Sequence, residues 1–498
     1  MGNLCEKSAD DEDLRKFYPS FFYYVENLEK YEPGGLHPTH LGEVYDNGRY
    51  KIVHKLGFGH LSTVWLAHDL QCKRYVALKI VAAKDSQDYK DFKDLKESDH
   101  PGRNYIASSL DCFWLQGPNG YHLCLVSHVL GPSISRMLLD SRLQPSIARS
   151  IALQATQGLA YLHSQGICHG NFTTSNVLFQ LSINFDSLSE EEVYALLGKP
   201  QTETVKRLSG EPPGPSAPIY VVDMPDFANI DPSKLLRQNI RIIDFDQSFY
   251  TTTPPTIMLG IPSNHMAPES IFDLKAGVHS DIWALGCAIF RLRAGYDLFD
   301  DFGDSGINSH SDTIRQVVKT IGRLPAAWSH IPFDEDGLPV RNGKKPKKES
   351  RMLEYEPIER PLLDSVSSIE DEPMGSPTLD SITEQNNGES KAILVPAEVG
   401  GRYRNGCSEL FWRPPSLVGT TFTLEEGKWV ATEQEAEVLS KISHEEAISF
   451  HDLLSRIFTY DPMRRISAKE LSRHPWFTGD FMVTRKRKEE GKELDRIE

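Results

Sequence analysis

Apolar and polar residues alternate over much of residues 49–80. This run, RYKIVHKLGFGHLSTVWLAHDLQCKRYVALKI, is rich in β-branched and aromatic residues and has a glycine-containing turn in its middle. Because side chains along a strand point alternately to its two faces, the pattern predicts three antiparallel strands. The charged segment 84–98 predicts one short helix, and runs 106–116 and 121–130 predict a strand pair around the turn GPNG. We therefore expect a five-stranded sheet with one helix.

The hydrophobic period changes after Gly131. Residues 146–166, SIARSIALQATQGLAYLHSQG, carry apolar residues three and four positions apart and end at a glycine, which predicts an amphipathic helix. The remainder is expected to be mainly helical, except for residues 182–238 and 331–440, which are rich in Pro, Gly, Ser and Glu. A structured loop of about 100 residues inside a compact domain is improbable, so the second stretch is predicted to be largely disordered in its middle.

Composition restricts the classes of function. The chain has 498 residues, 39% of them hydrophobic, and a net charge of -16 that argues against a general nucleic-acid binder. Its seven cysteines are scattered without a C-x-x-C pair, which favours a reduced intracellular compartment. No apolar run approaches the roughly 18 residues that span a bilayer, so no membrane partner is expected.

Targeting signals are weak. Gly2 follows the initiating methionine, but Glu6 stands where a myristoylation signal has Ser or Thr, so an unmodified N-terminus is expected. The basic clusters KKPKK at 344–348 and RKRK at 485–488 are candidate nuclear-import signals, although such runs are more often solvated surface. The expected location is cytoplasmic, nuclear or both.

The segment LGFGHLSTVWLA predicts a phosphate-binding hairpin. Gly57 and Gly59 would let backbone N–H groups approach a phosphate, and Val64 is placed to cover a base. Glycines in a hairpin are usually only a turn. About twenty residues further on, however, Lys79 is the sole charge of the strand VALKI, where it could pair with phosphates. Together these segments predict a phosphate cradle.

Further motifs follow in order along the chain. HGNFTTSN contains His169 and Asn176, and IRIIDFDQSF places Asp244 directly after an apolar strand, where a magnesium ligand is expected. MAPES supplies Glu269, and DPMRRISAKELSRHPWF supplies Arg465, its predicted partner in a buried ion pair. SDIWALGC places Asp281 at the start of a predicted buried helix. Each motif alone has an ordinary structural explanation, but their ordered series does not.

With these motifs the chain resembles the eukaryotic protein kinases, and among them the SR-protein kinases and their fungal relatives. The lead-in YEPGGLHPTHLGEVYDNGRYKIVHKLGFGHLSTVWLA, with Ser62 at the third glycine position, and the segment GIPSNHMAPE carry the subgroup likeness. The resemblance implies an α+β, bilobal fold with a small β-rich lobe, a larger helical lobe and two long insertions.

The resemblance also suggests how the chain is divided. The expected parts are an N-terminal extension over 1–49, a small lobe over 50–131, the first part of the large lobe over 132–330 with an insertion at about 182–238, a low-complexity insertion over 331–440, the end of the large lobe over 441–478 and a charged tail over 479–498.

The resemblance assigns roles to individual residues. Lys79 would hold the α- and β-phosphates of ATP, Asn176 and Asp244 would hold Mg²⁺, and His169 and Asn171 would belong to the catalytic loop. Backbone groups of the hinge would meet adenine. The other implied nucleotide-binding positions are Leu56, Gly57, Gly59, Ser62, Val64, Ala77, Ser127, His128, Leu130 and Leu178. For Val64, Ala77 and Leu178 the alternative is ordinary hydrophobic core.

Three positions depart from the kinase pattern. Asn171 replaces the aspartate base, Thr173 replaces the cation two positions on that contacts the transferred phosphate, and Asp246 replaces the glycine of D-F-G. The acidic partner of the nucleotide-binding lysine is also hard to place. Glu97 lies close to the breaker HPGR, and Asp91 or Asp94 are alternatives with a shorter reach.

Two functions follow from the resemblance. The first is an ATP- and Mg²⁺-dependent serine/threonine protein kinase, slowed by Asn171, that acts as a monomer on protein substrates, for which the resemblance implies Arg-Ser-rich sequences. The alternative is a pseudokinase that binds nucleotide and serves as a scaffold or allosteric partner. A third class, a direct nucleic-acid binder, is disfavoured by the acidic charge.

Overall fold

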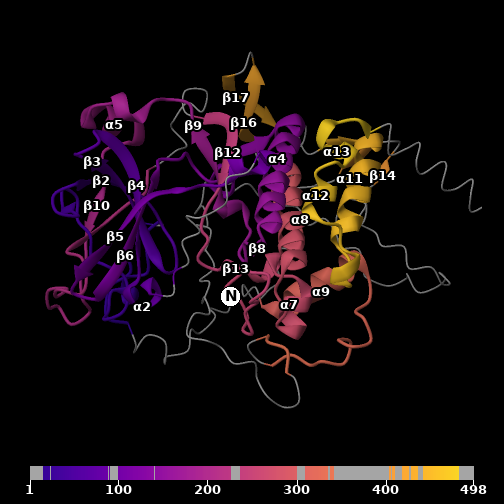
Figure 1. The fold of residues 1–498 in the computed structure, drawn as a ribbon, viewed down its shortest axis with the longest axis horizontal. Coiled ribbons are helices and arrows are strands. Elements are labelled where there is room, and N and C mark those ends of the chain that lie inside the picture. Colours follow the sequence, from indigo (N-terminus) through magenta and orange to yellow (C-terminus); the bar gives the residue numbers. More distant parts are fainter. Residues whose placement is uncertain are drawn as a thin grey trace, which may run out of the picture.

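The computed structural model shows a β-rich small lobe and a helical large lobe (Figure 1). The residues that the structure describes are 15–22, 24–87, 89, 99–138, 141–225, 236–299, 309–334, 337–340, 403–404, 407–409, 418–425, 428–435 and 441–481. Within them no helix combines the length and the apolar character needed to span a membrane. The expected bilobal α+β architecture is confirmed.

The small lobe is one antiparallel sheet with the strand order β1-β2-β3-β4-β6-β5. Its strands are β1 (Val44–Tyr45), β2 (Tyr50–Phe58), β3 (Ser62–Asp69), β4 (Arg74–Val81), β5 (Ser109–Gly117) and β6 (Gly120–His128). The five strands expected from the alternating pattern are present, and β1 adds a sixth at the edge. The short helices of this lobe are η1 (Leu28–Lys30), α2 (Ala83–Ser86) and η2 (Pro101–Tyr105). Most of the helix expected over 84–98 lies outside the described residues.

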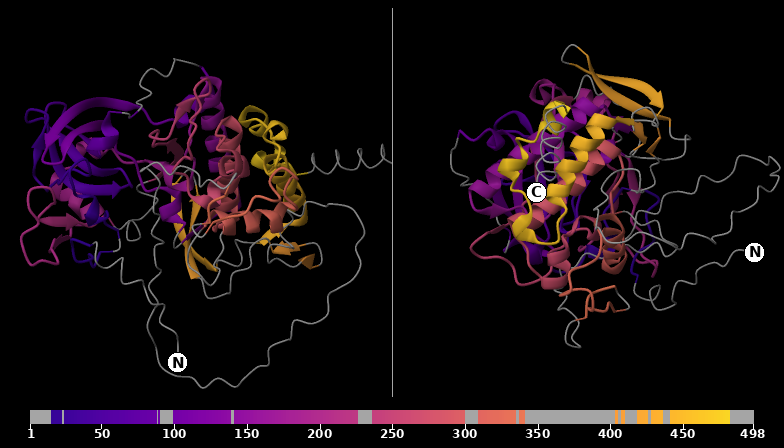
Figure 2. Two further views of the ribbon diagram at one scale, coloured as in Figure 1. Left: turned by 90° about the horizontal axis from the view of Figure 1, so that it is seen from below. Right: turned by 90° about the vertical axis from the view of Figure 1, so that its right-hand side faces the viewer.

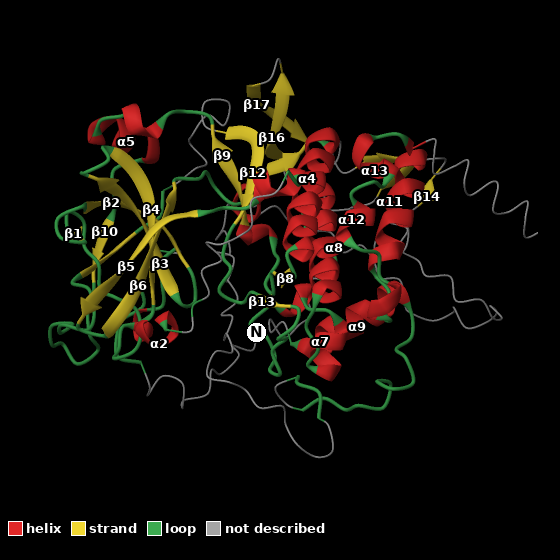
Figure 3. Ribbon diagram, viewed as in Figure 1, coloured by secondary structure: helices red, strands yellow, loops and turns green. Residues whose placement is uncertain are grey.

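The large lobe packs around two long helices, α4 (Pro145–Ser164) and α8 (Val278–Ala294) (Figure 3). Helix α4 confirms the helix expected from the apolar spacing after Gly131. The other helices are α3 (Ile134–Met137), η3 (Thr174–Asn176), η6 (Ser263–His265), α7 (Pro268–Asp273), α9 (His310–Ile321), α11 (His444–Ile457), η7 (Pro462–Arg464), α12 (Ala468–Leu471) and α13 (Pro475–Thr478). The short strands of the large lobe are β7 (Ser141–Leu143), β8 (Ile167–Cys168), β9 (Val177–Leu181), β12 (Leu236–Ile242), β13 (Phe249–Tyr250) and β18 (Lys441–Ser443).

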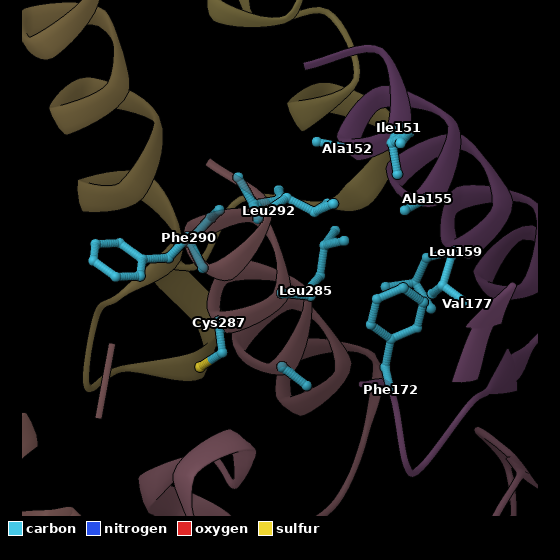
Figure 4. Close-up of a cluster of buried hydrophobic side chains, with 14 of the residues drawn as sticks. Ile151, Ala152, Ala155, Leu159, Phe172, Val177, Leu285, Cys287, Phe290 and Leu292 are labelled. Atoms are coloured by element: carbon cyan, nitrogen blue, oxygen red, sulfur yellow. The ribbon is translucent and has the colours of Figure 1, made fainter. Parts of the chain in front are cut away.

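The core of the large lobe lies between α4 and α8 (Figure 4). Leu159 of α4 and Leu285 of α8 are fully buried, and Phe172 from the loop after β8 points between them (Figure 4). Burying side chains of this size contributes roughly 1.5 to 3 kcal/mol each. The core therefore fixes the base of the loop that carries Asn171.

The first insertion is folded in its described part and packs on the small lobe. It contains η4 (Phe185–Ser187), α5 (Glu190–Leu197), β10 (Thr202–Thr204) and β11 (Tyr220–Val222). Helix α5 lies beside the small-lobe sheet, and buried Val193 packs with Val53 and Tyr75 (Figures 1 and 2). The backbone N–H of Tyr75 also donates to Asp186 at 2.9 Å. The insertion thus joins the two lobes outside the hinge.

The second insertion is ordered at its described ends. Phe333 and buried Leu338 belong to a cluster with Phe272 and Trp328, so residues beyond 331 continue the large lobe. Four strands follow later in this insertion: β14 (Tyr403–Arg404), β15 (Cys407–Glu409), β16 (Val418–Glu425) and β17 (Lys428–Glu435). Strand β16 pairs with β17 antiparallel and with β7 parallel. The predicted disorder in the middle of this stretch falls outside the described residues.

Candidate active site

The register of the small-lobe sheet gathers four predicted nucleotide-site residues on one face. Val64 of β3 stands opposite Lys79 of β4, and Ala77 stands opposite Ser127 of β6. Residues directly opposite in a ladder share a face, and so do residues two apart along a strand. Val64, Ala77, Lys79 and Ser127 therefore lie on the same side of the sheet.

Lys79 pairs with Asp244 across the lobes. Its ammonium group donates to Asp244 Oδ1, and its Nζ lies 3.5 Å from the hydroxyl of Tyr89 and 5.3 Å from the centre of that ring. Burial alone would lower the pKa of Lys79, but the Asp244 carboxylate outweighs it and the pKa is raised. Lys79 is therefore a fixed cation. The proposed acidic partners Asp91, Asp94 and Glu97 lie outside the described residues.

Asp244 and Asn176 are brought to neighbouring strand ends. Asn176 comes directly before β9 and Asp244 follows β12, and these two strands pair with Ile242 opposite Val177. The N–H of Ile243 donates to the Asn176 carbonyl oxygen at 2.9 Å. Asp244 has a φ of 67°, an unusual left-handed conformation for a residue with a side chain.

The donor set at these strand ends fits a magnesium ion. Asn176 Nδ2 donates to the Asn171 carbonyl oxygen at 2.9 Å, which leaves its Oδ1 as an acceptor. One carboxylate and one amide oxygen are the kind of sparse protein ligand set that Mg²⁺ uses when phosphates complete its shell. Asp244 and Asn176 could therefore hold Mg²⁺ together with a bound nucleotide.

The catalytic loop is held from beneath by His169 and Asp281. His169 is fully buried; its Nε2 donates to the Ile243 carbonyl at 3.1 Å and its Nδ1 accepts from the Asn171 N–H at 3.3 Å. Burial lowers the pKa of His169, so its ring is neutral. Asp281 accepts from the N–H groups of His169 at 2.7 Å and Gly170 at 2.9 Å. His169 thus links the loop to the strand that precedes Asp244.

Gly170 is required by the course of this loop. Its φ is 79°, and a Cβ built there would lie 2.2 Å from the carbonyl oxygen of Gln247. A side chain at this position would force the loop and the segment after Asp246 apart. Glycine therefore keeps the catalytic loop in contact with the metal-site segment.

The structure shows neither a carboxylate at position 171 nor a cation at position 173. Asn171 Oδ1 is buried, and it has no hydrogen-bond partner in the described part of the chain. Thr173 is 6% exposed and carries no charge. Position 171 therefore supplies an amide oxygen in place of a carboxylate, and position 173 supplies no cation.

Asp246 adds a carboxyl group beside the Lys79–Asp244 pair. Burial, followed by the Asp244 carboxylate, raises the pKa of Asp246 to about 7. It lines a cavity with Lys79, Asp85 and Tyr89, and Leu61, Val81 and Gln247 complete the lining. The sequence did not predict Tyr89 and Asp85 as site residues, because the short, charged segment that contains them has no periodicity that would assign either residue to a face.

The other predicted site residues lie around the glycine-rich hairpin and the hinge. Gly57 pairs with Val64, and the N–H of Gly59 donates to the carbonyl oxygen of Ser62 at 2.8 Å, which closes the hairpin tip. Leu56 packs near Val53 and Tyr75. Ser62 is buried, His128 is exposed, and Leu130 and Leu178 are half-buried.

Comparisons with known proteins agree with this geometry. A model of the protein kinase domain family matches residues 50–186 and 229–477. Protein kinase dsk1 of Schizosaccharomyces pombe is 27% identical over 410 residues, 65% of this chain and 75% of that protein. Serine/threonine-protein kinase SRPK of Physarum polycephalum is 29% identical over 325 residues, 61% of this chain and 74% of that protein.

A third relative matches over a shorter segment. SRSF protein kinase 3 of Homo sapiens is 39% identical over 166 residues, which cover 31% of this chain and 29% of that protein. The family match covers most of both lobes, and two of these three relatives are named as SRSF protein kinase or SRPK. The chain belongs to the eukaryotic protein kinases and resembles the SR-protein kinases among them.

Proposed function

We propose that this chain is an ATP-binding serine/threonine protein kinase of the SR-protein type, attenuated by Asn171. The observation that carries the proposal is the convergence of Lys79, Asp244 and Asn176 at the face of the glycine-rich hairpin. This arrangement supplies a fixed cation for phosphates and two oxygen ligands for Mg²⁺. The same features support nucleotide binding even if no phosphate is transferred to a substrate.

Each residue of the site has a defined task in this proposal. Lys79, held as a cation by Asp244, would bind the α- and β-phosphates, and the hairpin of Gly57 and Gly59 would cover them. Asn176 and Asp244 would hold Mg²⁺, which when bound neutralises charge on the transferred phosphate. Val64 and Ala77 face the same side and would pack on the base.

Asn171 is expected to slow the reaction and not to prevent it. Its amide oxygen can accept a hydrogen bond from a substrate hydroxyl and orient it, but an amide cannot take up the proton at neutral pH. General-base help is worth about 10² to 10⁴-fold, whereas positioning and electrostatics account for most of phosphoryl transfer. The neutral Thr173 removes further stabilisation of the transferred group.

Basic protein substrates fit the charge of the chain. Its net charge is -16, and the relatives named as SRSF protein kinase suggest Arg-Ser-rich targets. We propose such a protein substrate, no direct contact with nucleic acid, a monomeric state and a location in the cytoplasm, the nucleus or both.

The alternative is a nucleotide-binding pseudokinase, and the uncharged, buried Thr173 favours it. In that case the site would hold nucleotide to stabilise one arrangement of the lobes for a protein partner. The carboxyl group of Asp246 adds to this alternative, because the D-F-G pattern has a glycine at that position and therefore no second carboxyl group beside Asp244.

One experiment separates the two. Single-turnover transfer from Mg-ATP to an Arg-Ser peptide is measured for the natural chain and Asn171→Asp, with Lys79→Ala as the binding-deficient control. The kinase proposal expects slow transfer by the natural chain and a gain of about two or more orders of magnitude in Asn171→Asp. If both chains bind ATP but transfer no phosphate to the peptide, the result supports the pseudokinase alternative.

A further inference from the structure

The N-terminal extension reaches the glycine-rich hairpin through a buried ion pair. Glu26 Oε2 accepts a hydrogen bond from Lys55 Nζ, and the hydroxyl of Tyr31 donates to Glu26 Oε1. The side chains of Lys55 and Glu26 are 0% and 3% exposed. Lys55 belongs to β2, the strand that continues into Gly57 and Gly59. Since a buried charge needs a partner, the strand of the phosphate hairpin depends on the extension.

A second contact holds the tip of the hairpin. Lys30 Nζ contacts His60 Nδ1, and it lies 3.0 Å from His60 Nε2 and 3.4 Å from the His60 carbonyl oxygen. Burial, followed by the charges of Lys30 and Lys84, lowers the pKa of His60 to about 4. The ring is therefore neutral near pH 7, and one ring nitrogen can accept a hydrogen bond from the Lys30 ammonium.

The extension also joins the end of β4. The N–H groups of Ala83 and Lys84 donate to the carbonyl oxygens of Gly35 at 3.0 Å and Gly34 at 2.8 Å, and the N–H of Ala82 donates to the hairpin residue Leu61 at 2.7 Å. Apolar residues anchor the extension on the small lobe and the first insertion. They are Phe17, Leu28, Tyr31, Leu36, Ala82, Val205, Ala217 and Val221. The extension is thus fixed independently of the hairpin that it contacts.

We infer that this extension is a working part of the nucleotide site, in which Lys30 and Glu26 are positioning residues that hold the phosphate-covering hairpin through His60 and Lys55. The inference rests on the proposed binding of ATP. A hairpin held in place before the ligand arrives loses less conformational freedom on binding, so the contact should favour ligands that carry phosphates. Adenosine has no phosphates and does not extend beneath the hairpin tip, so its affinity should depend little on this contact.

The test compares ligands with and without phosphates. Mg-ATP and adenosine are titrated by calorimetry against the natural chain, Lys30→Met and Lys30→Arg, with Lys16→Met as the matched control. Lys16 lies in the same extension and pairs with Glu32 on the surface, where both side chains are about half exposed. Lys30→Met should weaken Mg-ATP by roughly tenfold, as expected for one lost charge-assisted hydrogen bond, and should leave adenosine unchanged. Lys30→Arg should restore most of the affinity.

The outcomes separate this inference from the proposed function. A natural chain that binds adenosine and Mg-ATP, with no selective loss of Mg-ATP in Lys30→Met, would overturn the inference alone. Equal weakening of both ligands would also overturn it, because it would show a general structural role. A natural chain that binds no Mg-ATP would remove the proposed function together with the inference. For Glu26→Gln, a folded variant with the same selective loss would support the role of the buried pair.

Discussion

Arg465 and Glu269, 196 positions apart in the sequence, form a two-point ion pair inside the large lobe. Arg465 Nη1 and Nη2 donate to the two carboxylate oxygens of Glu269 at 2.6 and 3.1 Å, and their side chains are 0% and 5% exposed. The same guanidinium donates to the carbonyl oxygens of His279 and Thr459. The pair therefore ties α7, at the end of the segment after Asp244, to the loop before α12.

Loss of this pair should destabilise the large lobe. Arg465→Ala leaves the Glu269 carboxylate buried without its cation, which typically costs about 3 to 5 kcal/mol. The neighbouring Arg464 is 83% exposed at its side chain and pairs with Asp461 on the surface, so Arg464→Ala is the matched control with an effect of less than about 1 kcal/mol. Urea unfolding of both variants measures the difference. Equal midpoints would contradict a structural role for the pair.

Stability should decline as the pH falls below about 6.5. His37 is buried against His122 and Tyr45, and burial, followed by the charge on His122, lowers its pKa to about 4. The unfolded chain takes up this proton near pH 6.5 and the folded chain only near pH 4, so the free energy of unfolding falls between these values. His37 alone would contribute at most about 3 kcal/mol over that window, at about 1.4 kcal/mol per pKa unit.

The measurement is the free energy of unfolding between pH 7 and pH 5, above the range where Glu43, whose pKa is lowered to about 2, begins to contribute. His37→Gln should flatten the decline without abolishing it, because the pKa of His60 is also lowered to about 4. His330→Gln, at an exposed histidine, should leave the slope unchanged. An unchanged slope in His37→Gln would contradict this origin of the pH dependence.

The first insertion should contribute to the stability of the small lobe. Val193 is fully buried against Val53 and Leu66, so Val193→Ala removes two methyl groups from a packed site and should cost about 1 to 3 kcal/mol. Leu208 lies in the same insertion and is 44% exposed, so Leu208→Ala should change stability by less than about 0.5 kcal/mol. If both variants unfold alike in urea, the insertion does not stabilise the lobe.

Periodicity in the sequence was sufficient to predict the strands and the helix that build the site. The alternation around Gly57 and Lys79 predicted β2, β3 and β4, and the spacing after Gly131 predicted α4, because half-buried strands and helices impose these periods on their own residues. The Glu269–Arg465 pair was also predicted, from two motifs of the family pattern.

Contacts between irregular segments left no such pattern. Lys30 and Glu26 precede the first long strand in a stretch without periodicity, and their partners His60 and Lys55 are assigned only by the folded chain. The first insertion was classified by its Pro and Gly content, although Val193 and Leu197 are placed one helical turn apart and bury one side of α5. A helix of this length carries too few apolar residues to outweigh the composition around it.

The residue behind the adenine site gives the last prediction. Ser127 is half-buried, lies on the same face as Lys79, and forms no side-chain hydrogen bond within the described residues. A serine leaves room where kinases place a larger side chain, so ATP-competitive compounds with a large aromatic extension should bind the natural chain. Ser127→Phe should weaken such a compound by more than about tenfold, since each buried methylene is worth about 0.8 kcal/mol, and it should leave the affinity for ATP unchanged.

Tyr89 packs with Val81 and Leu125 near this face and is the group that could fill the space instead. Tyr89→Ala is therefore titrated alongside, with a compact inhibitor as the control ligand. Tight binding of the bulky compound to the natural chain and its selective loss in Ser127→Phe would establish an open pocket, whereas equal affinity for both chains with a gain only in Tyr89→Ala would show that Tyr89 closes it.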